Sequence, residues 1–108
     1  MRKLDLSPYP VQNGEKMGVY NCRQVCEAVL FSQQLGLTGK RLAEHMDIWK
    51  KVESCLDNNL LLEDAEFAVL ERAFDGVQDF GKGDYEFYMR VKNAPKVNQV
   101  AEVTDGQS

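Results

Sequence analysis

The spacing of apolar residues changes near residue 21, and this change divides the predicted secondary structure into two parts. Residues 3–21 predict an extended β-hairpin, because Asn13-Gly14 is a strong turn signal with apolar residues on both sides. Pro8 and Pro10 exclude a helix there and confine the first strand to the edge of a sheet.

After the hairpin, apolar residues recur at intervals of three and four, which is typical of amphipathic helices. Asn21 and Thr38 are suitable N-cap residues, and Gly36 and Gly76 are suitable helix ends. The predicted helices lie near residues 22–35, 39–57, 63–76 and 84–93.

Two of these helices have apolar faces that matter for function. The second is predicted to bury Leu42, Met46, Trp49, Val52 and Leu56, and the fourth to bury Tyr85, Tyr88, Met89 and Val91. Between them, the short run 60–62 predicts either a brief strand that joins the hairpin or an extended lead into the third helix.

Together these elements predict an α+β fold that is mostly helical, with an N-terminal β-hairpin packed on about four short helices. The length predicts a single domain, which we place at residues 1–96. Residues 97–108 are small, polar and without period, and they predict a flexible, disordered tail.

The charge balance changes the range of expected partners. The formal net charge is −4 at pH 7, whereas most nucleic-acid-binding domains present a basic surface. Nucleic-acid or nucleoprotein binding is therefore an alternative only. It would use a basic set on the first two helices that comprises Arg23, Lys40, Arg41, Lys50 and Lys51.

No apolar run has the length of a membrane span, and no secretory signal precedes the hairpin. The three cysteines are an odd number, which is not typical of a disulfide framework. We therefore expect a cytoplasmic protein, in the host cytoplasm if a phage encodes it, with no membrane partner.

Three cysteines and one histidine are the candidate chemical groups. Cys22, Cys26 and Cys55 with His45 could form a Cys3His zinc site, which would give a metal-supported domain. Cys22 and Cys26 lie one turn apart in an apolar stripe, however, which favours buried free thiols. His45 lies beside the stripe and is interpreted as a solvated surface residue. We therefore predict no catalytic residue, no bound metal and no cofactor.

Aromatic residues provide the strongest candidate for binding. Three aromatic residues and a methionine lie within residues 84–89, and one helix face cannot bury them all, so Phe87 or Tyr88 should be partly exposed. Aromatic residues are enriched at interface cores. The leading prediction is a non-enzymatic module that binds a protein partner or self-associates through Trp49, Tyr85, Phe87 and Tyr88.

The order of several short segments resembles that of small, uncharacterised accessory proteins encoded by bacteriophages and prophages. The resemblance covers about residues 4–97 and implies a viral accessory or virion-assembly role, with no catalytic residues. The segments are Asp-Leu-Ser-Pro-Tyr-Pro-Val, Ala-Val-Leu-Phe, Leu-Thr-Gly-Lys-Arg-Leu-Ala-Glu, Leu-Leu-Leu-Glu-Asp-Ala-Glu-Phe and Arg-Val-Lys-Asn-Ala-Pro-Lys-Val.

Overall fold

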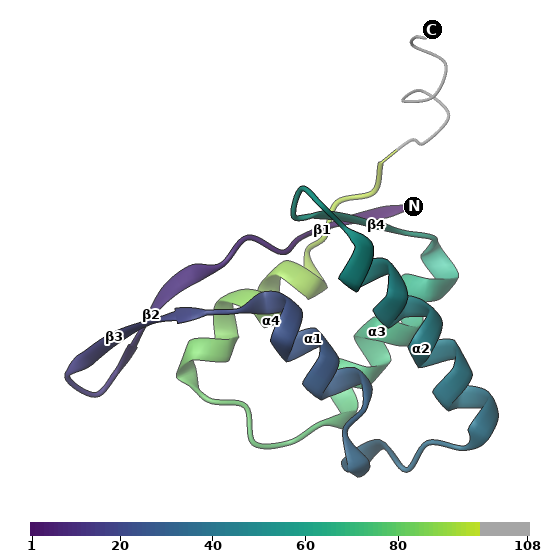
Figure 1. Cartoon of the computed structure of the whole chain (residues 1–108), viewed down its shortest axis with the longest axis horizontal. Helices are drawn as coiled ribbons and strands as arrows, with labels where there is room; N and C mark the ends of the chain where they lie inside the picture. The colour runs from purple at the N-terminus through teal and green to yellow at the C-terminus, as the bar shows by residue number, and fades with distance from the viewer. Residues whose placement is uncertain (98–108) are drawn as a thin grey trace, which may run out of the picture.

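Two antiparallel strand pairs and four α-helices form an α+β fold in the computed structural model, which describes residues 1–97 (Figure 1). The predicted fold class is confirmed. In chain order the elements are β1 (Arg2–Asp5), β2 (Tyr9–Asn13), β3 (Lys16–Tyr20), α1 (Cys22–Leu30), η1 (Gln33–Leu35), α2 (Gly39–Ser54), β4 (Asn59–Leu62), α3 (Asp64–Gly76), η2 (Lys82–Asp84) and α4 (Tyr85–Lys92).

The predicted tail, residues 97–108, lies outside the described residues except for Val97, whose amide donates a hydrogen bond to the carbonyl of Met1. None of the helices within residues 1–97 is long and apolar enough to cross a membrane.

The N-terminal strands belong to two separate sheets, so the predicted N-terminal hairpin is present but does not extend over residues 3–21. β1 pairs with β4, where Arg2 lies opposite Leu62, and only β2 and β3 form the hairpin. Ser7 and Pro8 interrupt the strand, and the Asp5 carboxylate accepts a hydrogen bond from the Ser7 amide at this bend. The run 60–62 is therefore the brief strand that the sequence allowed, but it pairs with β1.

Local signals in the sequence fix most helix ends. The Asn21 side chain accepts a hydrogen bond from Gln24 N–H, and Thr38 does the same for Arg41 N–H, so both predicted N-caps are confirmed. α1 ends at Leu30, earlier than predicted, and η1 follows it. Gly36 then ends η1 in the left-handed conformation, with a φ of +57°.

Helix α3 is the centre of the helical layer, because it packs against α1, α2 and α4. Its buried face is as predicted, with Phe67, Leu70, Ala73 and Phe74 almost fully enclosed. A capping box begins the helix, in which the carboxylate of Glu66 accepts the backbone N–H of Glu63.

Helix α2 buries a different face from the one predicted. Val52 is buried as predicted, but Leu42, Met46 and Leu56 are exposed and Trp49 is half-buried. The other buried residues of the helix are His45 and Ile48. The prediction of a solvated His45 is therefore wrong. Both faces have helical spacing, and the neighbouring helices α1 and α3 select the one that contains the histidine.

Helix α4 also differs from its prediction. Phe87 and Val91 are its fully buried residues, and Tyr85 is exposed. Phe87 packs edge to face against Phe74 of α3, with 5.6 Å between ring centroids, and lies 6.0 Å from the ring of Tyr20. Phe87 therefore holds α4 and the hairpin to α3, and the prediction that it belongs to an exposed binding surface is wrong.

Candidate partner-binding surface

The β2–β3 hairpin has two faces of different character. Residues that pair directly across the strands lie on the same face, so the pairs Tyr9–Tyr20 and Val11–Gly18 form one face. The pairs Pro10–Val19 and Gln12–Met17 form the other, and these four residues are exposed. The hairpin projects beyond the helices, as Figure 1 shows.

The tyrosine face fixes the hairpin to η2 and α4. The rings of Tyr9 and Tyr20 are stacked, with 4.7 Å between centroids. The Tyr9 hydroxyl donates to the carbonyl of Gly83 (2.8 Å) and accepts the amide N–H of Phe87 (3.1 Å). The hydroxyl of Tyr20 donates to the carboxylate of Asp84 at 2.6 Å.

Burial raises the pKa of Tyr20 far above its ordinary value, and the hydrogen bond to the Asp84 carboxylate raises it further. The phenol therefore stays protonated and remains a donor at any physiological pH. Titration of Tyr20 therefore does not make the contact between the hairpin and η2 depend on pH in that range.

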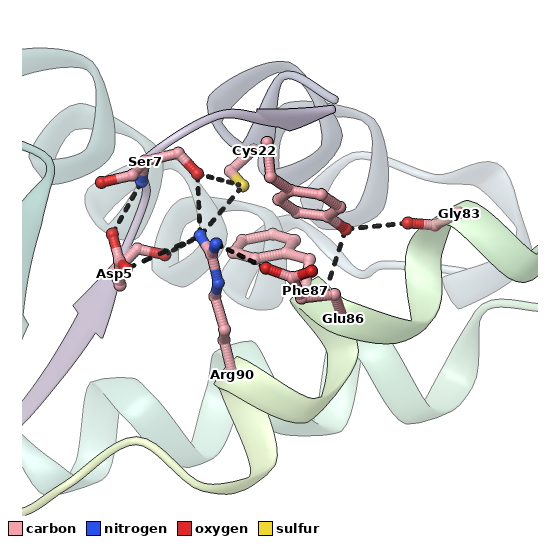
Figure 2. A network of polar contacts seen from close by, with 8 residues as sticks. Asp5, Ser7, Cys22, Gly83, Glu86, Phe87 and Arg90 are labelled. Carbon is pink, nitrogen blue, oxygen red and sulfur yellow. Dashed lines mark hydrogen bonds and ion pairs between the residues drawn. The ribbon is translucent and has the colours of Figure 1, made fainter. Parts of the chain in front are cut away.

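Arg90 fixes the base of the hairpin. Its guanidinium donates to the carbonyl of Ser7 (2.8 Å) and to the carboxylate of Glu86 (2.8 Å), and it lies 3.8 Å from the Asp5 carboxylate (Figure 2). It also lies over the ring of Tyr9, 4.9 Å from the centroid. The bend between β1 and β2 is thus held to α4 by one side chain.

The opposite face of the hairpin has no partner within residues 1–97. Met17 is 68% exposed and Val19 is 73% exposed, and Pro10 lies between them and the groove described next. Two neighbouring apolar side chains with this exposure are unusual on a small projecting element, and such patches mark interaction sites. We call Pro10, Met17 and Val19 the hairpin patch.

A groove of about 620 Å³ separates the hairpin from the start of α4. Tyr85, which is 66% exposed, lines it together with Pro10 and Val11. Tyr85 also lines a second hollow of about 410 Å³ on its other side, with Phe80 and Tyr88. Tyr85 therefore lies across this groove from Pro10, which is the member of the hairpin patch that lines it.

The predicted aromatic binding residues do not form one cluster. Tyr85 and Tyr88 share the second hollow, and the Tyr88 hydroxyl donates to Asp75 at 2.9 Å. Trp49 lies on α2, and α3 packs between α2 and α4. Trp49 therefore belongs to a second surface, where Leu42 and Met46 lie on the same side of α2 at helical spacing.

The basic residues of the nucleic-acid alternative are spread over α1 and α2. The Arg23 guanidinium donates to the carbonyl of Val52 and to the side chain of Asn58, and Lys51 pairs with Glu66 at 2.8 Å. Lys40 and Arg41 lie at the start of α2, and Lys50 lies near its end. Two of the five residues are thus already engaged in holding the fold together.

The three cysteines and His45 do not converge. Cys22 and Cys26 are buried, as predicted, and Cys55 is half-buried. Burial raises the pKa of the Cys22 thiol to about 11 and that of the Cys26 thiol to about 12, so neither is a ready nucleophile. Within residues 1–97, no three His, Cys, Asp or Glu side chains lie close enough to hold a metal ion.

The sequence analysis missed Met17 and Val19 as candidate binding residues. Both lie in the second strand of the predicted hairpin, where the sequence analysis assigns them no binding role. The alternation of side chains along the two strands indicates this exposure. Tyr9 and Val11 pair with Tyr20 and Gly18 and lie on one face of the hairpin, so Met17 and Val19 lie on the opposite face.

Comparison of the chain with protein-family models, with curated proteins and with solved structures gave no significant match.

Proposed function

We propose that this protein is a non-enzymatic protein–protein interaction or assembly module whose main contact surface is the hairpin patch together with Tyr85. One observation carries the proposal. The hairpin is bonded to the body through Tyr9 and Tyr20 and at its base by Arg90, while Met17 and Val19 on its other face are more than two-thirds exposed.

The energetics favour a contact at this surface. Burying an apolar side chain of this size stabilises a complex by about 1.5–3 kcal/mol when it leaves water completely. Met17 and Val19 would together contribute roughly 3–5 kcal/mol, and an aromatic side chain such as Tyr85 adds a typical interface anchor. Because the hairpin is already ordered, little conformational entropy would be lost on binding.

Trp49, with Leu42 and Met46, is the proposed second contact surface on α2. The resemblance to phage-encoded accessory proteins extends the proposal to a viral accessory or assembly role in the cytoplasm of the host cell. The buried thiols, with their raised pKa values, support a role without covalent catalysis.

The test compares the double variant Met17→Lys/Val19→Lys with a matched control. Leu56→Lys is suitable as the control, because Leu56 is 96% exposed but lies beyond the end of α2, away from the hairpin. Each protein would be purified for light scattering and also used as bait in a nuclease-treated lysate of its source cells. Nuclease treatment removes contacts that nucleic acid bridges.

We expect the wild-type protein and Leu56→Lys to share an assembly state or a retained partner that the double variant loses. Far-UV circular dichroism of all three should be the same, since none of the changed side chains is buried. If the double variant keeps the assembly state and every partner of the wild type, the hairpin patch is not the contact surface and the proposal fails.

A further inference from the structure

We infer that the β3 edge of the hairpin binds a second copy of this chain, so that two β3 strands pair antiparallel and two hairpins form one four-stranded sheet. This inference rests on the proposed function, because it names the partner of the same hairpin. Four observations on β2, β3 and η2 support it.

The first observation concerns the backbone groups at the edges of the hairpin. The loop has two residues, Gly14 and Glu15, and the pair that flanks such a loop is hydrogen-bonded. Hydrogen-bonded pairs then alternate along the ladder. The pairs Gln12–Met17 and Pro10–Val19 are therefore not hydrogen-bonded, and their backbone groups point away from the hairpin. Within residues 1–97, no further strand pairs with either edge.

The second observation is that the two edges are not equally protected. Pro10 removes a donor from the outer edge of β2, and proline is a common way of blocking strand addition. On the outer edge of β3, Met17 and Val19 each keep an N–H and a carbonyl, and neither is charged. The open edge is thus the one that carries Met17 and Val19, which are both more than two-thirds exposed.

The third observation is Gly18, at the centre of β3. A glycine inside a strand weakens it, and such a glycine often marks a close approach by another backbone. A Cβ atom at Gly18 would meet nothing within 4 Å, and the φ of Gly18 lies outside the left-handed region. The fold of one chain therefore does not require this glycine, and at residue 18 no side chain stands on the tyrosine face beside the open edge of β3.

These observations define a register. With Gly18 opposite Gly18 of the second copy, Met17 lies opposite Val19 of the second copy, and the reverse pair follows by symmetry. Both members of these pairs have free backbone groups, so each pair exchanges two hydrogen bonds. The two hairpin patches then lie side by side on one face of the sheet.

The fourth observation is charge complementarity across this register. Lys16 lies opposite Tyr20 of the second copy, on the face where the Tyr20 hydroxyl meets the Asp84 carboxylate. The lysine ammonium can therefore reach that carboxylate. In the part of the chain that the structure describes, neither Lys16 nor Asp84 forms an ion pair. A second copy places its lysine at this position by symmetry, whereas a strand of another sequence would carry one there only by chance, which favours a second copy.

A disulfide trap tests the register directly. In a Cys55→Ser background, Gly18→Cys would place two thiols opposite each other, because residues in a non-hydrogen-bonded pair have Cα atoms about 4.5 Å apart. A disulfide accepts Cα separations of about 4.4 to 6.8 Å. The matched control is Gln12→Cys, on the other strand. Cys22 and Cys26 are buried in every variant.

We expect mild oxidation to convert Gly18→Cys to a covalent dimer and to leave Gln12→Cys largely monomeric. Sedimentation equilibrium should show a concentration-dependent dimer of the wild-type chain. Lys16→Glu should weaken that dimer about tenfold, because it replaces two ion pairs with like-charge contacts, whereas Lys50→Glu should not change it.

A wild-type chain that stays monomeric at millimolar concentration, with no preferential cross-linking at residue 18, would overturn the inference. A dimer that Lys16→Glu leaves unchanged and that Gly18→Cys does not trap would overturn it as well. In either case the proposed function stands or falls separately, on whether Met17→Lys/Val19→Lys loses a partner from the lysate.

Discussion

The Nδ1 atom of His45 lies 2.7 Å from the carbonyl oxygen of Leu30, and both residues are buried. A carbonyl can only accept, so Nδ1 carries the proton and donates. Leu30 is the last residue of α1, where carbonyls lack partners within the helix. The single histidine of the chain therefore caps one buried helix end from the side of another helix.

Replacing His45 should destabilise the fold strongly. His45→Ala leaves a cavity and a buried carbonyl without a donor, and we expect a loss of about 2–4 kcal/mol in the free energy of unfolding. His45→Asn keeps an N–H donor near the position of Nδ1 and should recover part of this loss. Urea denaturation measures both. The control Met46→Ala, at an exposed position, should change stability little, and equal losses for all three would contradict this role.

The hydroxyl of Tyr20 should contribute to the position of the hairpin. Tyr20→Phe removes the hydrogen bond to the Asp84 carboxylate, and a bond to a charged group is worth about 1.5–3 kcal/mol. We expect lower stability and faster amide hydrogen exchange in β2 and β3. Tyr85→Phe is the control, because Tyr85 is exposed. Unchanged exchange in Tyr20→Phe would show that other contacts hold the hairpin.

Arg90 should not be replaceable by lysine. The guanidinium contacts a carbonyl, two carboxylates and the ring of Tyr9 at the same time, which an ammonium cannot do. Arg90→Lys should destabilise the protein by about 1–3 kcal/mol in thermal or urea unfolding. Arg72→Lys, on the exposed side of α3, should be neutral. If Arg90→Lys does not change the free energy of unfolding, the positive charge alone is sufficient to hold the bend.

The bend at Ser7 should also depend on pH. Partial burial raises the pKa of Asp5, but the Ser7 hydrogen bonds and the charge of Arg90 lower it more, so it lies below the ordinary 3.8. A depressed pKa contributes stability above pH 3.8 that is lost as the pH falls through the folded-state value. Asp5→Asn should therefore lose less stability than the wild type between pH 5 and pH 3. Urea unfolding of both proteins at pH 5 and at pH 3 measures this difference. If the wild type and Asp5→Asn lose the same stability between the two pH values, Asp5 does not make the fold depend on pH.

Signals within a few residues predicted the helix starts well. The caps at Asn21 and Thr38 depend on side chains next to the helix, and the structure has both. The predicted ends were less accurate, because α1 stops at Leu30 and Gly36 ends η1 instead. The buried face of α2 could not be predicted in this way. Two stripes of similar spacing compete there, and packing against α1 and α3 buries the one that contains His45, whose Nδ1 meets the carbonyl of Leu30.

The candidate surface was predicted only in part, for a similar reason. Tyr85 and Tyr88 were identified because a dense aromatic run cannot be buried by one helix. Phe87 is buried because Phe74 and Tyr20, both distant in sequence, meet it from two sides. The exposure of Met17 and Val19 depends on the register of β2 with β3. A shift of one residue would have turned both side chains to the opposite face of the hairpin.

The position of β1 has a consequence for biosynthesis. β1 leaves the ribosome before every other element, yet it pairs with β4 on one side and bonds to residues 95–97 on the other. Both edges of this strand, with Leu4 between them, stay open until most of the chain has been translated. The helices can assemble during elongation, but the pairing of β1 on both of its edges is completed only when residues 95–97 have been made.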